Sequence, residues 1–295
     1  MGGIITLRVG TRGSRLALKQ TEDIIGKLSR ISPTKIEKVI VKTSGDKIKD
    51  SQLYKIDRKG IFTRELDIAV LEERVDFAVH SLKDVPTEID ENLTIAAVPK
   101  RGSPHEVLVS RLDWDELPAN SRIGTSSLRR EAFCKHYKKE FKLEPLRGNI
   151  DTRIRKVMKG EIDATIMAEA GLKRLGLEEN IKRRFPLKYI TPPAGQGALA
   201  VITRKDNPHL NLISKLNHYR SLQEVKAEKS VLKELGVGCQ WPLGVIARTR
   251  NKKLCLYAIL LSREGDILSQ VTLEGPINKA QELGEKVANE MEDYI

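Results

Sequence analysis

The sequence predicts an α/β protein in which two similar clamshell domains precede a small C-terminal α+β domain. Three observations favour this fold class. Strand and helix patterns alternate along the first part of the chain, short phrases recur in its two halves, and the pattern changes near residue 218. Alternating strands and helices are typical of a mainly parallel sheet that is covered by helices.

The first domain is expected at residues 1–98 and 198–217. Ile5, Leu7 and Val9 alternate as in a strand, and Ser14 follows a Gly-containing break where it can cap a helix. A second helix is indicated by apolar residues at helical spacing between Phe62 and Val70. Further strands are expected at 36–41, 75–79 and 93–98.

The second domain, expected at 103–192, repeats the alternation of strands and helices seen in the first. Its strands are predicted at 106–109, 122–124 and 164–167, with helices after Ser126 and Asn149. The phrase Val9–Ser14 matches Ile123–Ser127, and Arg74–Ala78 matches Glu161–Thr165. Together these matches favour two related α/β domains that face a shared cleft.

Two loops are candidates for the connections between these domains, Pro99–Pro104 and Thr191–Gly197. If both cross over, the strand at 198–203 returns to the first domain, which is the plan of hinged ligand binders. The third domain, 218–295, is expected to contain a helix up to Leu235, three strands and a closing helix. Those strands are predicted at 243–247, 254–260 and 267–273, and the helix near 279–291.

The composition favours a soluble protein that binds an anion. The 295 residues include 52 basic and 40 acidic side chains, which gives a net charge of +12. Aromatic residues make up only 4%, too few to favour stacking on single-stranded bases, so a small anionic ligand is preferred to nucleic acid. No apolar run reaches the length of a membrane span and no signal core is visible, so a cytoplasmic protein is expected. Three cysteines and scattered histidines indicate free thiols and no metal site.

Four arginines mark the expected ligand site: Arg129, Arg130, Arg147 and Arg153 fall where two strands give way to two helices. Helix starts attract anions, and a guanidinium binds a carboxylate or phosphate with two hydrogen bonds. Arginines on solvated helix faces are the alternative, which we accept for Arg155 and Lys156. For the four, the neighbouring Gly, Ser and Thr residues favour binding of a ligand with several negative charges.

Three further features leave alternatives open. Cys239 lies in a Gly- and Pro-bounded loop, where it is either an accessible nucleophile or a small buried side chain. Asp84 follows a buried strand and either pairs with Lys83 or serves as the acid/base group of a positive cleft. The polar stretch 44–60 is either a lid that closes over an anion or a solvated loop.

The chain resembles the porphobilinogen deaminase (hydroxymethylbilane synthase) family. The phrases that carry this resemblance run in order along some 230 residues: Thr11–Ser14, Lys59–Phe62, Ala78–Pro86, Gly124–Arg130, Leu146–Asn149, Ala170–Gly176, Gly195–Gly197 and Gly238–Cys239. The resemblance implies domains similar to type II periplasmic binding proteins, and a monomeric cytoplasmic transferase of tetrapyrrole and heme biosynthesis without nucleic-acid or membrane partners. Val237 and Trp241 depart from the usual family pattern beside the cysteine.

The resemblance also implies residue roles. Cys239 would carry a dipyrromethane cofactor through a thioether, and Asp84 would be the catalytic carboxylate. Lys55, Lys59 and Phe62 would belong to a mobile loop and its hinge. The groups that would hold the carboxylates of cofactor and substrate are Arg12, Ser14, Ser81, Lys83, Thr125, Ser126, Ser127, Arg129, Arg130, Arg147, Gly148, Arg153, Arg174 and Gln196.

The implied reaction suits these residues. Four porphobilinogen molecules would condense in turn on the cofactor with loss of ammonia, and hydrolysis would release hydroxymethylbilane. The cofactor and chain would together carry roughly a dozen carboxylates, whose repulsion arginines offset. Positive charge that develops on the pyrrole nitrogen would be stabilised by Asp84. A non-enzymatic clamshell binder of an anionic solute and a nucleic-acid binder are the alternative functions.

Overall fold

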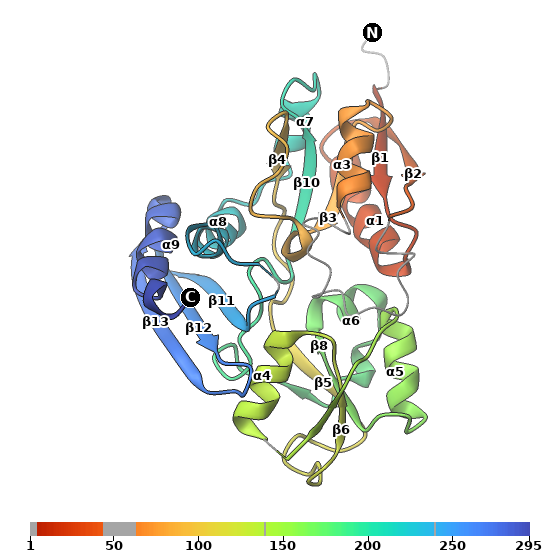
Figure 1. Ribbon diagram of the computed structural model, residues 1–295. Helices are drawn as coiled ribbons and strands as arrows, with labels where there is room; N and C mark the ends of the chain where they lie inside the picture. The colour runs from red at the N-terminus through yellow and green to blue at the C-terminus, as the bar shows by residue number, and fades with distance from the viewer. Residues whose placement is uncertain (1–4, 44–62, 139, 239) are drawn as a thin grey trace. The chain divides into compact units, whose positions relative to one another are not determined.

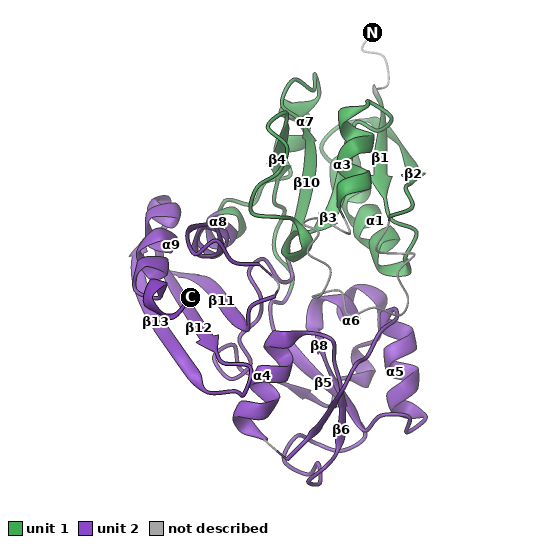
Figure 2. Ribbon diagram, viewed as in Figure 1, with its two compact units in different colours: residues 1–48, 58–102, 198–222 green, residues 49–57, 103–197, 223–295 purple. Residues whose placement is uncertain are grey.

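The computed structural model describes residues 5–43, 63–138, 140–238 and 240–295 (Figure 1). The chain forms two compact units, which Figure 2 distinguishes by colour. Of the described residues, unit 1 contains 5–43, 63–102 and 198–222, and unit 2 contains the rest from 103 to 197 and from 223 to 295. No helix among the described residues is long and apolar enough to cross a membrane.

Unit 1 is built on a five-stranded sheet of order β2-β1-β3-β10-β4. The central strand β3 (Phe77–Ser81) is parallel to β1 (Ile5–Thr11), which is parallel to β2 (Thr34–Ile40). Strand β10 (Leu199–Arg204) runs antiparallel to both β3 and β4 (Leu93–Ala97). The strand predicted at 198–203 therefore returns to the first sheet, as the sequence indicates.

Helices flank this sheet because their apolar faces join its core. The helix α1 (Arg15–Ser29) begins after Ser14, whose hydroxyl accepts a hydrogen bond from the Ala17 N–H at 3.3 Å. Its residue Ile24 packs in one core with Val9, Phe77 and Val201. Among the described residues, unit 1 also contains α3 (Arg64–Leu71), α7 (Leu210–Ser214) and the 3-10 turn η2 (Leu82–Asp84).

Unit 2 contains a sheet with the same plan, of order β7-β6-β8-β5-β9. Strand β6 (Arg122–Gly124) is parallel to β7 (Lys142–Glu144) and to β8 (Ala164–Ala168), while β5 (Glu106–Ser110) runs antiparallel to β8 and to β9 (Arg183–Arg184). Its helices are α4 (Leu128–Tyr137), α5 (Ile150–Met158), α6 (Glu169–Leu175) and the 3-10 turn η3 (Glu178–Asn180). In both sheets the fourth strand is the one that reverses direction, so the expected α/β class with two similar sheets is confirmed.

A third, antiparallel sheet also belongs to unit 2. It consists of β11 (Leu243–Arg250), β12 (Lys253–Leu261) and β13 (Ile267–Pro276). It is accompanied by α8 (Tyr219–Glu234), which starts in unit 1, by α9 (Ala280–Asn289), and by the 3-10 turns η4 (Ile277–Lys279) and η5 (Glu292–Tyr294).

Side chains of β12 alternate between two cores. Leu256 packs with Val231 of α8 and Val287 of α9, whereas Tyr257 joins a core that includes Phe133 of α4. The third sheet is therefore packed against the second within unit 2. The division into three domains remains a prediction, because the second and third expected domains fall in one compact unit.

Candidate functional site

The residues expected to act together are divided between the two units. In unit 1, the candidates Arg12 and Ser14 follow strand β1. Ser14 is used as the cap of α1, and Arg12 is half-buried. Thr11, just before them, is buried and its hydroxyl accepts a hydrogen bond from Thr21 at 2.8 Å. The turn from β1 into α1 is therefore fixed by side-chain hydrogen bonds.

The candidates Ser81, Lys83 and Asp84 follow the central strand β3. The Ser81 hydroxyl accepts a hydrogen bond from Gln20 at 2.9 Å, and the Leu82 N–H donates to the Ala198 carbonyl at 3.0 Å. These bonds anchor the segment to α1 and to the start of β10. Lys83 is half-buried, and Asp84 is exposed to solvent at the end of η2. The carboxylate is thus held on a fixed turn and remains accessible.

In unit 2, three hydroxyl candidates shape the turn between β6 and α4. The Thr125 hydroxyl accepts from the Ser127 N–H at 3.1 Å, and Ser126 donates to the Leu146 carbonyl at 3.1 Å. Ser127 caps α4 by accepting from the Arg130 N–H at 3.5 Å. Each hydroxyl therefore has a structural hydrogen bond, which orients the first turn of α4.

That first turn carries Arg129 and Arg130, both buried. Their shared partner is Glu106 of strand β5, whose side chain is fully buried. Arg130 donates to both carboxylate oxygens, through Nε at 3.2 Å and Nη2 at 2.8 Å. Arg129 donates to the same carboxylate and, through Nη1 at 2.5 Å, to the Thr191 carbonyl. A buried ion cluster therefore links α4, β5 and the second crossover segment.

Glu106 was missed by the sequence reasoning, which considered only the neighbours of the arginines along the chain. Its signal was available, because Glu106 precedes the run Val107-Leu108-Val109 in a strand expected to be buried. A carboxylate buried at such a position requires a cationic partner.

Arg147 and Arg153 belong to the next strand-to-helix turn, between β7 and α5. Arg153 donates through Nε to the Gly148 carbonyl at 2.8 Å, which closes the turn onto the helix. Gly148 has a φ of +109°, a conformation that favours glycine. Burial, reinforced by the positive charges of Arg130 and Arg147, lowers the pKa of Arg153 to about 10. The charges of Arg130 and Arg147 therefore repel that of Arg153.

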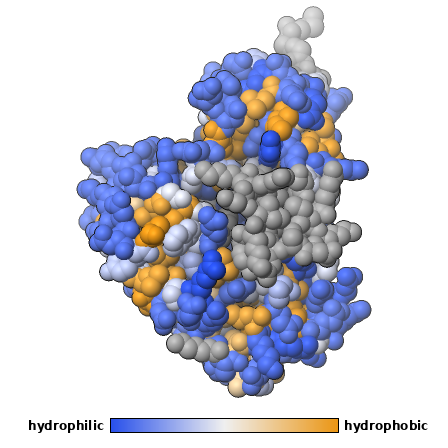
Figure 3. Space-filling view, in the orientation of Figure 1, coloured by the Kyte–Doolittle hydropathy of each residue, from blue (hydrophilic) through white to orange (hydrophobic). Residues whose placement is uncertain are grey.

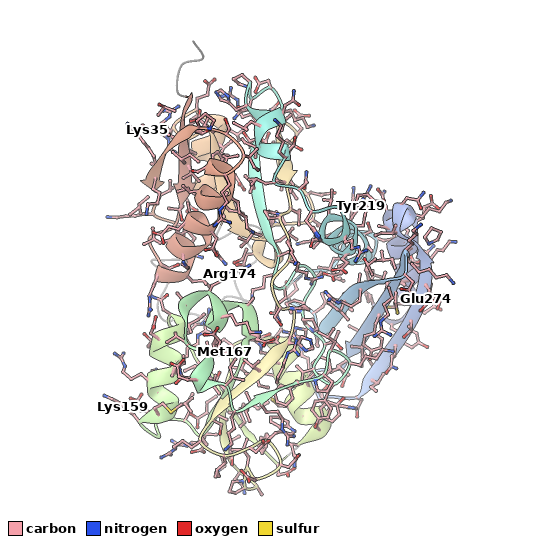
Figure 4. The ribbon with its side chains drawn as sticks, turned by 180° about the vertical axis from the view of Figure 1, so that it is seen from behind. Lys35, Lys159, Met167, Arg174, Tyr219 and Glu274 are labelled. Atoms are coloured by element: carbon pink, nitrogen blue, oxygen red, sulfur yellow. The ribbon has the colours of Figure 1, made fainter. Side chains whose placement is uncertain are left out.

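Arg174 and Gln196 complete the candidates of unit 2. Figure 4 shows Arg174 on helix α6 and Met167 on strand β8, which leads into that helix. Arg174 donates to the Gly197 carbonyl at 2.9 Å. Gln196 is fully buried and donates to the Pro104 carbonyl at 2.9 Å, so it joins the two crossover segments.

Four candidates lie outside the described residues: Cys239, Lys55, Lys59 and Phe62. The other cysteines are described. Cys134 is buried in α4, and Cys255 is half-buried in β12. Arg155, which the sequence analysis assigned to a solvated face, is exposed. Figure 3 shows hydrophilic side chains over much of the visible surface, as the high charge content predicts.

The fold and this site define a class of protein, an α/β protein with arginines gathered at the strand-to-helix turns of its second sheet. Comparisons with known families agree with that class. Residues 7–211 match the model of the porphobilinogen deaminase dipyromethane cofactor binding domain, and residues 222–293 match that of the porphobilinogen deaminase C-terminal domain. The chain belongs to the porphobilinogen deaminase family.

Curated relatives support the same assignment. The chain is 66% identical to a probable porphobilinogen deaminase of Methanothermobacter thermautotrophicus, over 97% of this chain and 99% of the relative. It is 42% identical to a porphobilinogen deaminase of Desulforamulus reducens, over 97% of this chain and 94% of the relative.

A solved periplasmic substrate-binding protein of Coxiella burnetii is similar with 12% identity and a TM-score of 0.46, over 73% of this chain and 93% of that one.

These findings confirm the family resemblance inferred from the sequence, together with the transferase class and the dipyrromethane cofactor that it implied. They do not bear on individual site residues, which remain predictions.

Proposed function

We propose that this chain condenses four porphobilinogen molecules in turn onto a dipyrromethane primer and releases hydroxymethylbilane by hydrolysis, with Asp84 as the catalytic carboxylate. The observation that best supports this reaction is the group of like charges in unit 2. Burial, with the charges of Arg130 and Arg147, lowers the pKa of Arg153, and an anion bound by these guanidinium groups would relieve their repulsion.

The arginine group suits a ligand with several carboxylates. Guanidinium groups bind carboxylates through pairs of hydrogen bonds, and this binding offsets the cost of removing the anions from water. We assign Arg130, Arg147 and Arg153 to the carboxylates of the cofactor and the growing chain. Arg129, Arg174 and the hydroxyls of Thr125, Ser126 and Ser127 would support them, since each already has a structural hydrogen bond.

The donor set of unit 2 fits a dipyrromethane group. Two of its arginines, Arg129 and Arg130, share the single carboxylate of Glu106, so this cluster carries more positive than negative charge. Cys239 would hold the group by a thioether, and the group would supply a pyrrole carbon to which substrate units are added. Gly148 and Gln196 would shape the neighbouring turns and would not themselves be charged partners.

Asp84 suits the chemical step because its carboxylate is exposed while its backbone is anchored. Loss of ammonia from porphobilinogen creates positive charge that spreads to the pyrrole nitrogen. A fixed carboxylate can accept the pyrrole N–H and stabilise that charge. The segments that follow β1 and β3 in unit 1 also carry Arg12, Ser14, Ser81 and Lys83. We assign these four side chains to the carboxylates of the incoming substrate.

The remaining assignments rest on the family. Lys55, Lys59 and Phe62 are proposed to form a mobile loop with its hinge. We also propose that the protein works as a monomer in the cytoplasm, without nucleic acid or membrane. Size-exclusion chromatography with light scattering would give the mass of one chain, and a dimer mass would reject the monomer.

Two measurements test the function. Intact-mass spectrometry of the purified protein should show an excess equal to one dipyrrole, and Cys239→Ser should lack it. An active wild-type protein without excess mass would overturn the covalent attachment. A porphobilinogen assay then tests the catalyst. Asp84→Asn should fold and lose turnover by at least about 100-fold.

The matched control for Asp84→Asn is Glu88→Gln. Glu88 is an exposed carboxylate four positions further along the same unit, so the substitution removes the same charge from the surface. It should leave turnover within about twofold. Near-normal turnover in Asp84→Asn, or an equal loss in both variants, would remove Asp84 from the role of catalyst.

A further inference from the structure

Glu106 occupies a position where an unpaired carboxylate would destabilise the fold. It is the first residue of β5, its side chain is fully buried, and it pairs across the sheet with Ala168. Removing a carboxylate from water costs several kcal/mol unless cations and hydrogen bonds compensate. Here two adjacent arginines of α4 supply that compensation.

The two arginines use Glu106 differently. Arg129 is 5% exposed and is bound at both ends of its guanidinium, by Glu106 and by the Thr191 carbonyl. Arg130 presents its Nε and Nη2 edge to the two carboxylate oxygens, in the bidentate geometry that orients a guanidinium most strongly. Arg129 is thus a link between elements, and Arg130 is held by one edge.

The other edge of the Arg130 guanidinium is not used to bind Glu106. Within the described part of the chain, its Nη1 makes no hydrogen bond to protein, and its side chain keeps 11% exposure. Arg130 is also the guanidinium whose charge acts on Arg153, together with that of Arg147. The arrangement therefore leaves one donor edge of Arg130 without a protein acceptor among the described residues. The single negative charge of Glu106 offsets only part of the charge of the two arginines that share it.

We propose that Glu106 is a positioning residue for the reaction: it holds Arg130 by one edge so that the opposite edge binds a carboxylate of the dipyrromethane group. This inference rests on the proposed function of Arg130. It predicts that Glu106 acts through Arg130 and has little effect on binding once Arg130 is removed.

A double-mutant cycle tests the proposal. Glu106→Gln keeps the size of the side chain but loses its charge and one acceptor oxygen, so Arg130 loses its fixed orientation. We expect a lower share of cofactor-loaded protein by intact mass, and a fall in kcat/KM for porphobilinogen of about 10- to 100-fold. Arg130→Met should show at least the same loss. The double variant should be no worse than Arg130→Met alone.

The matched control is Glu224→Gln. Glu224 is another buried glutamate of unit 2 that accepts from an arginine, Arg248 at 3.3 Å, and from the Thr249 N–H at 2.9 Å. The Glu224→Gln variant should have lower thermal stability, with unchanged cofactor loading and unchanged kcat/KM of the folded protein. The comparison separates loss of a buried ion pair from loss of arginine orientation.

The outcomes are distinct. If Arg130→Met loses loading and activity while Glu106→Gln does not, or if the two losses multiply in the double variant, Glu106 is a structural residue only and the inference is overturned. If neither single variant loses loading, the role proposed for Arg130 fails. Should Glu106→Gln not fold, Glu106→Asp provides the test, because it retains the charge but is shorter. Its folded fraction should be partly loaded and should lose activity, and full loading with full activity would overturn the proposal.

Discussion

His80 and Asp67 face each other inside unit 1, with the imidazole Nε2 3.6 Å from the carboxylate Oδ1. Both atoms are buried, and neither has a hydrogen-bond partner among the residues that the structure describes. Burial raises the pKa of Asp67 to about 6, a shift that a hydrogen bond from Thr63 opposes and the charge of Asp90 reinforces. Burial, with the charge of Arg12, lowers the pKa of His80 to about 4.

The two shifts predict opposite effects of pH on stability. Between pH 6 and the ordinary value of 3.8, the folded state binds the Asp67 proton more tightly than the unfolded state, so this group stabilises the fold as pH falls. Between the ordinary value of 6.5 and pH 4, the unfolded state binds the His80 proton more tightly, so stability is lost as pH falls. In the wild type the two contributions largely cancel.

Replacing either side chain should reveal the pH dependence of stability that the other contributes. For Asp67→Asn we expect the free energy of unfolding to decrease, relative to the wild type, by about 1–3 kcal/mol between pH 6.5 and 4.5. For His80→Gln we expect a relative increase of similar size over that range. Urea unfolding at several pH values measures both. Parallel curves for the wild type and both variants would show that neither pKa is shifted.

Gly265 is predicted to be intolerant of any side chain. It lies in the turn between β12 and β13 with a φ of +96°, and an added Cβ would lie 2.6 Å from the His136 nitrogen and 2.9 Å from the Ala132 carbonyl oxygen. Both are backbone atoms of α4, so they cannot rotate away. Gly265→Ala should therefore lower stability by about 3 kcal/mol or more, measured by urea unfolding.

The control for this variant is Gly176→Ala. Gly176 also has a left-handed backbone, with a φ of +66°, but an added Cβ would meet no atom within 4 Å. This variant should lose only the conformational term, about 1 kcal/mol. Equal losses in the two variants would mean that the backbone contacts of Gly265 do not matter.

The sequence predicted the repeated plan of the two sheets from a few matched letters, and the structure gives the physical reason. The Asp76 N–H donates to the Arg8 carbonyl at 2.8 Å, and the Asp163 N–H donates to the Arg122 carbonyl at 2.9 Å. Their carboxylates accept from the N–H groups of the same arginines, at 2.5 Å and 2.7 Å. The recurring Asp therefore marks the same strand entry in both sheets.

Other features were beyond reach of the sequence pattern. Strands β7 and β9 have three and two residues, too few for alternation to appear. Strand β3 was expected from Val75 but begins at Phe77, because Asp76 is used in the link to Arg8. The partnership of Glu106 with Arg129 and Arg130 joins residues more than twenty positions apart, and no local periodicity encodes it.

Because Asp163 links β6 to β8, its replacement should destabilise unit 2. Its carboxylate accepts from the Arg122 backbone and from the Arg122 guanidinium at 3.3 Å. Asp163→Ala leaves that backbone N–H without its partner, and we expect a loss of about 1–3 kcal/mol in urea unfolding. Glu161→Ala, which replaces an exposed acid two residues before Asp163, should cost about 0.5 kcal/mol or less. A smaller loss for Asp163→Ala than for Glu161→Ala would contradict the proposed link.

The cysteines provide a test that needs no activity assay. Burial raises the pKa of Cys134 to about 12, with the charge of Arg130 opposing the shift and that of Glu131 adding to it. The thiolate is the reactive form, so native Cys134 should resist iodoacetamide at pH 8. In denaturant the thiols of Cys134 and Cys255 should both be alkylated, while Cys239 should be blocked if it carries the proposed thioether. Peptide mapping that finds Cys134 labelled in the native protein would show that its burial is not maintained in solution. Alkylation of Cys239 in fully loaded, denatured protein would show that the cofactor is attached elsewhere.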